Sequence, residues 1–269
     1  MPRYIDIHTH AFPDTVAATA IPALEKSGNI KAYLDGTVAG LLKSMDKADI
    51  QTSVVCLIAT RPLQFRPILE WAESIRSPRI IPFPSVHPRD PDILEHLHEI
   101  HQKGFKGIKM HPYYQDFFLD EPALADFYQQ VEQLGLLLTV HCGYDIAYPR
   151  VRRSDPCRIL KLLEHFPGLK LLTTHFGGWD EWDDVQAMLI GNPIYMEISF
   201  ALDFLDQIRL RDMLLSHPRD YILFGTDSPW TDQKTTLKML GKLGLPDDLF
   251  QAITFENSAR LLALTPGTK

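Results

Sequence analysis

The chain has 269 residues, of which 45% are hydrophobic and 23% charged, and its formal net charge is −7. This composition is typical of a soluble globular protein, and the acidic balance argues against nucleic acid as a partner, because phosphate contacts need a basic face. No apolar run reaches membrane-spanning length and no signal peptide is expected, so we predict a cytoplasmic protein that does not bind membranes. Three cysteines without a CxxC pair do not form a disulfide framework.

Short β-branched or apolar runs alternate with amphipathic segments along the whole chain. Strands are predicted over residues 4–8, 53–58, 80–86, 107–111, 136–141, 170–175, 194–198 and 221–226. Helices are predicted over residues 37–48, 67–74, 90–102, 121–134, 156–165, 181–190, 203–216 and 233–243.

This alternation predicts an α/β protein with a parallel sheet, because parallel strands are joined by helical crossovers. Eight such units in about 250 residues match a (β/α)8 TIM barrel. A doubly wound open sheet is the alternative architecture. No linker or low-complexity stretch interrupts the chain, so residues 1–269 are predicted to form a single domain.

His8 and His10 follow one another on one face of the first predicted strand, because residues two apart share a face. Neutral imidazole is the commonest protein ligand of divalent metals. A strand that runs into a polar loop would explain a lone His-x-His pair equally well. The interpretation therefore depends on polar residues further along the chain.

Three such residues, His141, His175 and Asp227, stand at the ends of other predicted strands. Taken singly, each histidine can be a hydrogen-bonded core residue, and Asp227 can cap the next helix. In a (β/α)8 barrel, however, the strand ends converge on one mouth, where the active site lies. The five side chains together predict a metal site there.

Four motifs resemble the amidohydrolase superfamily, and within it the amidohydrolase-related branch that includes aminocarboxymuconate-semialdehyde decarboxylase. They are Ile-Asp-Ile-His-Thr-His (5–10), Thr-His-Phe-Gly-Gly (174–178), Phe-Gly-Thr-Asp-Ser-Pro (224–229) and the closing Glu-Asn-Ser-Ala-Arg-Leu-Leu (256–262). The resemblance covers the whole chain and implies a metal-dependent hydrolase barrel. It does not specify a substrate.

The resemblance implies a mononuclear site for Zn²⁺ or another divalent ion, with His8, His10, His141 and Asp227 as ligands. A water molecule would take the open position of such a catalytic site. Asp227 and His175 would be the catalytic residues. Asp227 would transfer a proton, and His175 would polarise the substrate or orient the water beside the metal.

Asp6 and Lys109 have alternative roles. Asp6 either accepts a hydrogen bond from an imidazole of the site or is a buried carboxyl group satisfied by its neighbours. Lys109 and His111, at the end of the fourth strand, are expected to face the substrate, and a structural ion pair is the alternative. In several branches of the superfamily this lysine is carboxylated and bridges two metals, so a binuclear site stays open. TatD-type nucleases place a glutamate there, which this chain lacks.

Arginine side chains follow the second and fifth predicted strands, and guanidinium groups suit carboxylate recognition. Arg61 is therefore a predicted substrate-binding residue, and the loop residues Arg150, Arg152 and Arg153 are weaker candidates. They leave open a carboxylated substrate.

The combined interpretation is a metal-dependent hydrolase that acts on an amide, lactone or related bond of a small molecule. Non-oxidative decarboxylation by a metal-dependent carboxy-lyase is the alternative, and a non-catalytic metal-binding barrel is the third hypothesis. The small-molecule substrate is the only partner expected, and a homodimer stays open.

Overall fold

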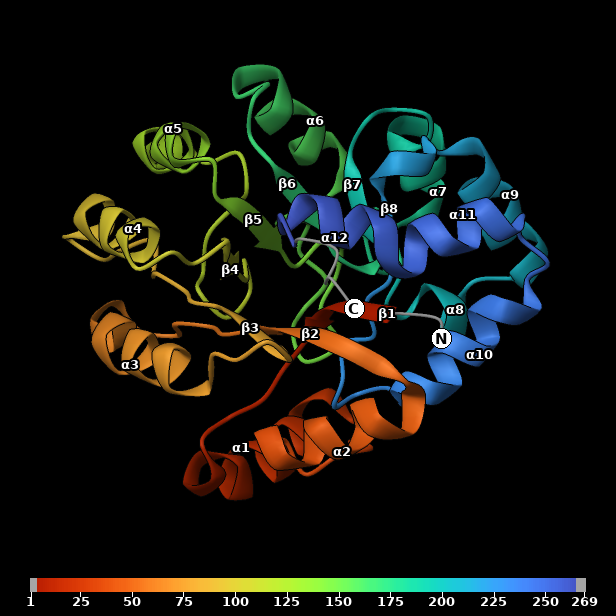
Figure 1. Cartoon of the computed structure of the whole chain (residues 1–269). Coiled ribbons are helices and arrows are strands. Elements are labelled where there is room, and N and C mark those ends of the chain that lie inside the picture. Colours follow the sequence, from red (N-terminus) through yellow and green to blue (C-terminus); the bar gives the residue numbers. More distant parts are fainter. Residues whose placement is uncertain (1–3, 265–269) are drawn as a thin grey trace.

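The computed structural model describes residues 4–264, which form a closed barrel of parallel strands surrounded by helices (Figure 1). The strands are β1 (Tyr4–Thr9), β2 (Ile50–Cys56), β3 (Ile80–Phe83), β4 (Gly107–Met110), β5 (Leu137–Val140), β6 (Leu171–Thr173), β7 (Tyr195–Glu197) and β8 (Ile222–Leu223). They pair in chain order within two arcs, β1–β2–β3 and β4–β5–β6–β7–β8.

Backbone hydrogen bonds close the barrel at both junctions between these arcs. The amide of Lys109 donates to the carbonyl of Pro84 at 2.9 Å, which joins β3 to β4. The amide of Ile7 donates to the carbonyl of Phe224 at 2.9 Å, which joins β8 to β1. The predicted (β/α)8 barrel is therefore confirmed, and the open sheet is excluded.

The α-helices lie outside the strands, with shorter ones in the loops. They are α1 (Asp14–Gly28), α2 (Val38–Ala48), α3 (Phe65–Ile75), α4 (Ile93–Gln102), α5 (Ala125–Leu134), α6 (Pro156–His165), α7 (Trp182–Asp184), α8 (Ala201–Phe204), α9 (Gln207–Ser216), α10 (Gln233–Lys242), α11 (Asp247–Gln251) and α12 (Asn257–Leu261). Within residues 4–264, none of these helices has both the length and the apolar character that a membrane span requires.

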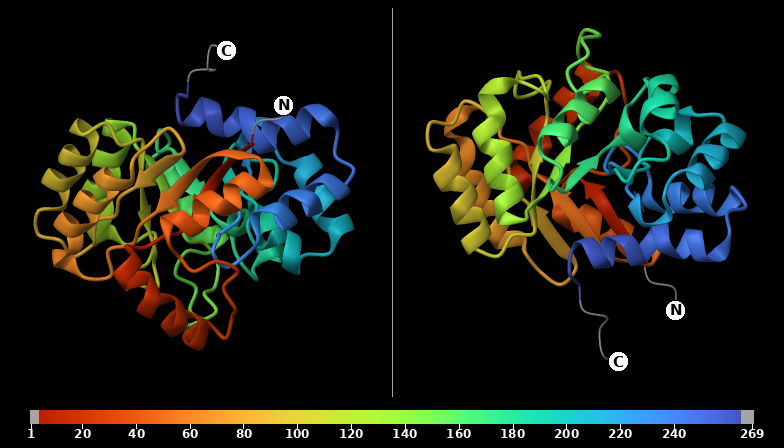
Figure 2. Two further views of the ribbon diagram at one scale, coloured as in Figure 1. Left: turned by 60° about the horizontal axis from the view of Figure 1, so that its bottom comes forward. Right: turned by 90° about the horizontal axis from the view of Figure 1, so that it is seen from above.

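Helix α1 is absent from the sequence prediction. It buries only Ala17 and Ile21 and contains Pro22, so it lacks the broad apolar stripe by which a helix is recognised in a sequence. It ends at Asn29, which adopts the left-handed conformation (φ 47°) that commonly terminates helices. Helix α1 lies at the end of the barrel opposite α11 and α12 (Figure 2).

The interior of the barrel is apolar near the amino-terminal ends of the strands. Ile5 and Ile7 of β1 pack there with Val54, Leu137 and Leu223 of other strands. Leu262, which follows α12, belongs to the same cluster. Above this apolar layer, the cavity described below opens at the carboxyl-terminal ends of the strands. The predicted strands also extend past the regular ladder there, since β5 ends at Val140 and β6 at Thr173.

Candidate active site

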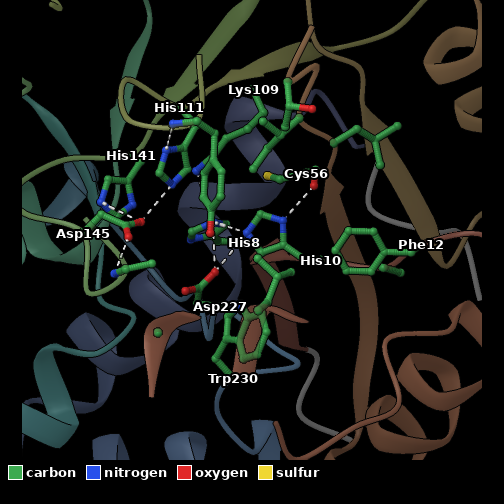
Figure 3. A pocket seen from close by; sticks show the side chains of 18 of the residues that line it. His8, His10, Phe12, Cys56, Lys109, His111, His141, Asp145, Asp227 and Trp230 are labelled. Carbon is green, nitrogen blue, oxygen red and sulfur yellow. Dashed lines mark hydrogen bonds and ion pairs between the residues drawn. The ribbon is translucent and has the colours of Figure 1, made fainter. Parts of the chain in front are cut away.

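A cavity of about 410 Å³ opens at the carboxyl-terminal ends of the strands. Its inner end is polar and its walls are apolar (Figure 3). The side chains at the polar end are His8, His10, Lys109, His111, His141, Asp145, His175 and Asp227. The structure therefore brings together all five residues that the sequence places at strand ends, along with Lys109 and His111.

His8, His10 and Asp227 form what we call the β1–β8 group. The Nε2 atoms of the two histidines are 3.1 Å apart, and Asp227 Oδ1 lies 3.3 Å from His8 Nε2 and 3.0 Å from His10 Nε2. Ligands of a tetrahedral zinc ion with bonds of about 2.0–2.1 Å are about 3.3 Å from one another. The donor types and their spacing therefore fit a divalent ion.

The other ring nitrogen of each histidine in this group has a fixed partner. His8 Nδ1 lies 3.0 Å from a carboxylate oxygen of the buried Glu197, and His10 Nδ1 lies 2.8 Å from the carbonyl oxygen of Cys56. If each Nδ1 carries the proton, each Nε2 has its lone pair free toward the group. These contacts orient both rings as metal ligands require.

His141 and His175 meet at one edge of the β1–β8 group. His175 Nε2 lies 3.0 Å from His141 Nδ1, and the ring of His175 is 5.7 Å from that of His8 between centroids. The hydroxyl group of Ser199 is 2.9 Å from His175 Nδ1 and donates to Glu197 at 2.8 Å. Glu197 therefore contacts the His8 ring directly, and it holds His175 both through the His175 amide, which donates to it at 2.9 Å, and through Ser199.

The backbone of His175 and of Asp227 is unusual for residues with a side chain. Both adopt positive φ angles, 55° and 57° respectively, in the left-handed region that most residues avoid. Asp227 is held by its amide, which donates to the carbonyl of His8 at 2.8 Å. Such conformations cluster at functional sites, where surrounding structure maintains them.

Lys109 is fully buried, and its ammonium nitrogen lies 3.2 Å from His8 Nε2. A buried ammonium group needs negative or acceptor partners, and Asp227 and Glu197 supply nearby charge. Burial and the Lys109 charge together hold the pKa of His8 well below its ordinary value. The same two causes lower the pKa of His141 to about 3. Both imidazoles are therefore neutral near pH 7, as metal ligands must be.

A second cluster, the β4–β5 group, consists of His111, His141 and Asp145. The rings of the two histidines stack with centroids 4.2 Å apart. Asp145 Oδ2 lies 3.4 Å from His111 Nε2 and 4.0 Å from His141 Nε2, and Asp145 Oδ1 accepts from the amide of Ala147 at 2.8 Å. Burial raises the pKa of Asp145 to about 6.

The structure decides between the two roles considered for Asp6. Its carboxylate accepts from the backbone amides of His8 and Thr226, from the Thr226 hydroxyl group and from the Gln233 side chain. It contacts no imidazole ring among residues 4–264. The role as a ring acceptor was therefore wrong, and Glu197 occupies that position instead.

The predicted substrate-binding arginine Arg61 is exposed and is not among the described residues that line the cavity. The three arginines after β5 are each paired with acidic residues: Arg150 with Asp180, Arg152 with Glu181 and Asp184, and Arg153 with Asp116. Lys109 is thus the one cationic side chain among residues 4–264 that lines the cavity.

Glu197, Ser199 and Asp145 are the site residues that sequence reasoning missed. Glu197 ends β7 in an apolar context, where an acidic residue between buried positions is a usable signal. Ser199 and Asp145 lie in loops, and no periodic pattern marks loop residues.

The chain is similar to one protein family in sequence and to several solved structures in fold. Residues 5–264 match the amidohydrolase family described as "Amidohydrolase". No curated protein sequence matches the chain. Similar solved structures include an uncharacterised TIM-barrel protein from Bordetella bronchiseptica, with a TM-score of 0.75, 18% identity and coverage of 97% of this chain and 98% of the other.

Two decarboxylases have the same fold. 2,6-Dihydroxybenzoate decarboxylase from Rhizobium has a TM-score of 0.73 at 17% identity, covering 98% of this chain and 99% of its own. 5-Carboxyvanillate decarboxylase from Sphingomonas paucimobilis has a TM-score of 0.71 at 13% identity, covering 98% and 100%. At these identities the similarity shows the fold and leaves the reaction open.

Proposed function

The chain belongs to the amidohydrolase family, and from this premise we propose that it is a metal-dependent hydrolase of small molecules. The bond it hydrolyses is an amide, a lactone or a related ester. One observation carries the proposal: the three closely spaced donor atoms of the β1–β8 group lie beside a buried ammonium group at the inner end of a cavity.

In this proposal His8, His10 and Asp227 hold a divalent ion, zinc or a similar metal, and His141 is the fourth ligand. A bound divalent ion acts as a Lewis acid and lowers the pKa of water toward about 7. The three imidazoles and the single carboxylate match the donor set that such ions use.

The side chains of the chain supply the proton transfers and the stabilisation of charge. Asp227 is placed to accept a proton from the attacking water and to pass it to the leaving group. Lys109, whose ammonium nitrogen lies 3.2 Å from His8 Nε2, stabilises negative charge on the carbonyl oxygen as it develops. His175 orients the attacking water through Nε2, which accepts a hydrogen bond because Nδ1 donates to Ser199. Ser199, at 2.9 Å from its Nδ1, orients His175 for this role.

Decarboxylation is the second candidate, favoured by the decarboxylases of the same fold. Lys109 argues against it. Loss of carbon dioxide removes negative charge from the carboxylate, so a fixed cation beside that carboxylate stabilises the ground state more than the transition state. In hydrolysis, negative charge develops on the carbonyl oxygen in the transition state, so Lys109 would lower the barrier of that reaction.

A binuclear site is the second candidate for the metal. His141 Nδ1 and His175 Nε2 are 3.0 Å apart, which is also a distance between two ligands of one ion. Carboxylation of Lys109 would supply a bridging carboxylate. Metal content near two equivalents, together with a protein mass increased by one carbon dioxide, would support this candidate over the mononuclear one.

The proposal is tested by metal analysis of the purified protein and by a panel of lactones, amides and aromatic carboxylates. We expect about one equivalent of divalent metal, loss of activity with a chelator and recovery on adding the ion back. Hydrolysis in ¹⁸O-labelled water should place the label in the product acid. Release of carbon dioxide without label incorporation would establish the lyase instead.

A further inference from the structure

The charged side chains and the apolar surfaces of the cavity lie in different places, and this arrangement indicates which kind of substrate fits. The charged side chains gather at the inner end, where Lys109 lies beside His8. The walls that extend from there toward the opening are apolar, formed by Phe12, Ile58, Trp71, Ile146, Phe204 and Trp230. A substrate that fills this space has its reactive group at one end and an apolar body.

The negative charge of Asp145, at the polar end of the cavity, has no spare cation to balance it. Asp145 lines the cavity with only 9% of its side chain exposed, and its nearest polar neighbours are the Ala147 amide and the His111 ring. Among residues 4–264 the lining holds two carboxylates, Asp145 and Asp227, but only one cation, Lys109. Lys109 is already placed against the β1–β8 group.

We infer that the substrate is an uncharged aryl or alkyl amide, ester or lactone, and that Asp145 excludes congeners whose body carries a carboxylate. Burying an unpaired carboxylate in an apolar wall is costly, and a second carboxylate nearby adds repulsion. Rejection by a repulsive group is a common basis of specificity. This inference rests on the proposed hydrolysis, and it replaces the carboxylated substrate left open by the arginines of the sequence.

The test compares two ligands of one shape, 4-methylacetanilide and 4-acetamidobenzoate, which differ by a methyl group against a carboxylate. Their affinities for the metal-loaded protein are measured by isothermal titration calorimetry at mildly alkaline pH. We expect the neutral ligand to bind at least about tenfold more tightly, the effect of one poorly compensated charge.

Asp145→Asn should reduce that ratio several-fold, because it removes the charge and keeps a side-chain oxygen for the Ala147 amide. Asp183→Asn is the matched control, since it removes one negative charge from a side chain that is 92% exposed. The control should leave the ratio unchanged. Its side chain pairs with Arg209 outside this cavity.

Equal or tighter binding of the carboxylated ligand to the wild type, or no binding of either ligand, would overturn the inference. An unchanged ratio in folded Asp145→Asn would overturn the role of Asp145. Amine release is followed separately. If the neutral ligand binds preferentially but no tested amide or ester is hydrolysed, the substrate inference stands and the proposed hydrolysis fails.

Discussion

The two histidine groups of the cavity differ in how far their donor atoms are prepared for a metal. In the β1–β8 group the three donor atoms lie within 3.0–3.3 Å of one another, and the remote nitrogen of each ring is held by Glu197 or by the carbonyl of Cys56. In the β4–β5 group the carboxylate is 3.4 and 4.0 Å from the two rings.

The remaining contacts of the β4–β5 group also indicate that it is less prepared for a metal than the β1–β8 group. His141 Nε2 lies 3.0 Å from the carbonyl oxygen of Tyr144, and one carboxylate oxygen of Asp145 accepts from the Ala147 amide. Its donors are therefore partly engaged with the loop after β5. The comparison shows that Asp227 is held at ligand spacing from the two rings of its group, whereas Asp145 lies farther from its rings and is engaged with the loop, so that only His141 of the β4–β5 group belongs to the proposed ligand set.

The largest expected effect is that of Asp227→Asn, which removes a charge and a base from the β1–β8 group. Turnover should fall by at least about 10²–10⁴-fold, and metal occupancy should fall with it because a carboxylate ligand is lost. Metal content and activity are measured on the same preparation. His8→Ala and His141→Ala should also lose metal, and full occupancy in either would contradict the proposed ligand set.

His175→Ala separates a catalytic residue from a ligand. We expect turnover to fall about 10²–10⁴-fold with metal content preserved, since His175 stands outside the mononuclear ligand set. Ser199→Ala should give a smaller loss, because it only releases the orientation of the His175 ring. If His175→Ala loses its metal, the binuclear assignment replaces the mononuclear one.

Glu197→Gln tests whether the contact between Glu197 and His8 Nδ1 holds the β1–β8 group in place for a metal. Replacing this carboxylate by a neutral amide should weaken metal affinity about 10–100-fold, the usual effect of changing a partner that hydrogen-bonds a metal-bound histidine. Competition with a fluorescent chelator measures the affinity. Glu73→Gln, which changes an exposed glutamate paired with Lys103, is the control. An unaltered affinity in Glu197→Gln would mean that Asp227 and the two rings are held without it.

Gly143→Ala should disturb the loop after β5, which carries Asp145. Gly143 has φ 82°, and an added Cβ would meet the backbone of Trp179. Gly104→Ala is the control, because Gly104 has φ 74° but nothing within 4 Å of an added Cβ. Strain alone costs about 1–2 kcal/mol, so Gly143→Ala should lower the free energy of unfolding by more than the control.

Denaturant unfolding measures that difference, and metal analysis shows whether the β1–β8 group keeps its ion. Equal destabilisation by the two substitutions would mean that the loop after β5 moves freely away from Trp179. Loss of metal in Gly143→Ala but not in Gly104→Ala would show that the loop after β5 also holds His141 in place as a ligand.

The barrel and most of the site were predictable from the sequence, because both depend on local patterns. Apolar strands alternate with amphipathic helices, and His8, His10, Lys109, His141, His175 and Asp227 stand at strand ends that any (β/α)8 barrel brings together. Helix α1 has no such local pattern, because it contains Pro22 and buries only a narrow face, and the sequence therefore did not predict it.

Only the tertiary structure decided which side chains form hydrogen bonds and ion pairs with these residues. Asp6 shares a strand with His8, yet its carboxylate is taken by Thr226 and Gln233 from the other end of the chain, while Glu197 reaches the ring. The arginines after β5 suited a substrate carboxylate until the fold paired each with an acidic side chain. Hydrogen bonds and ion pairs depend on side chains that are distant in sequence, and strand periodicity carries no information about those partners.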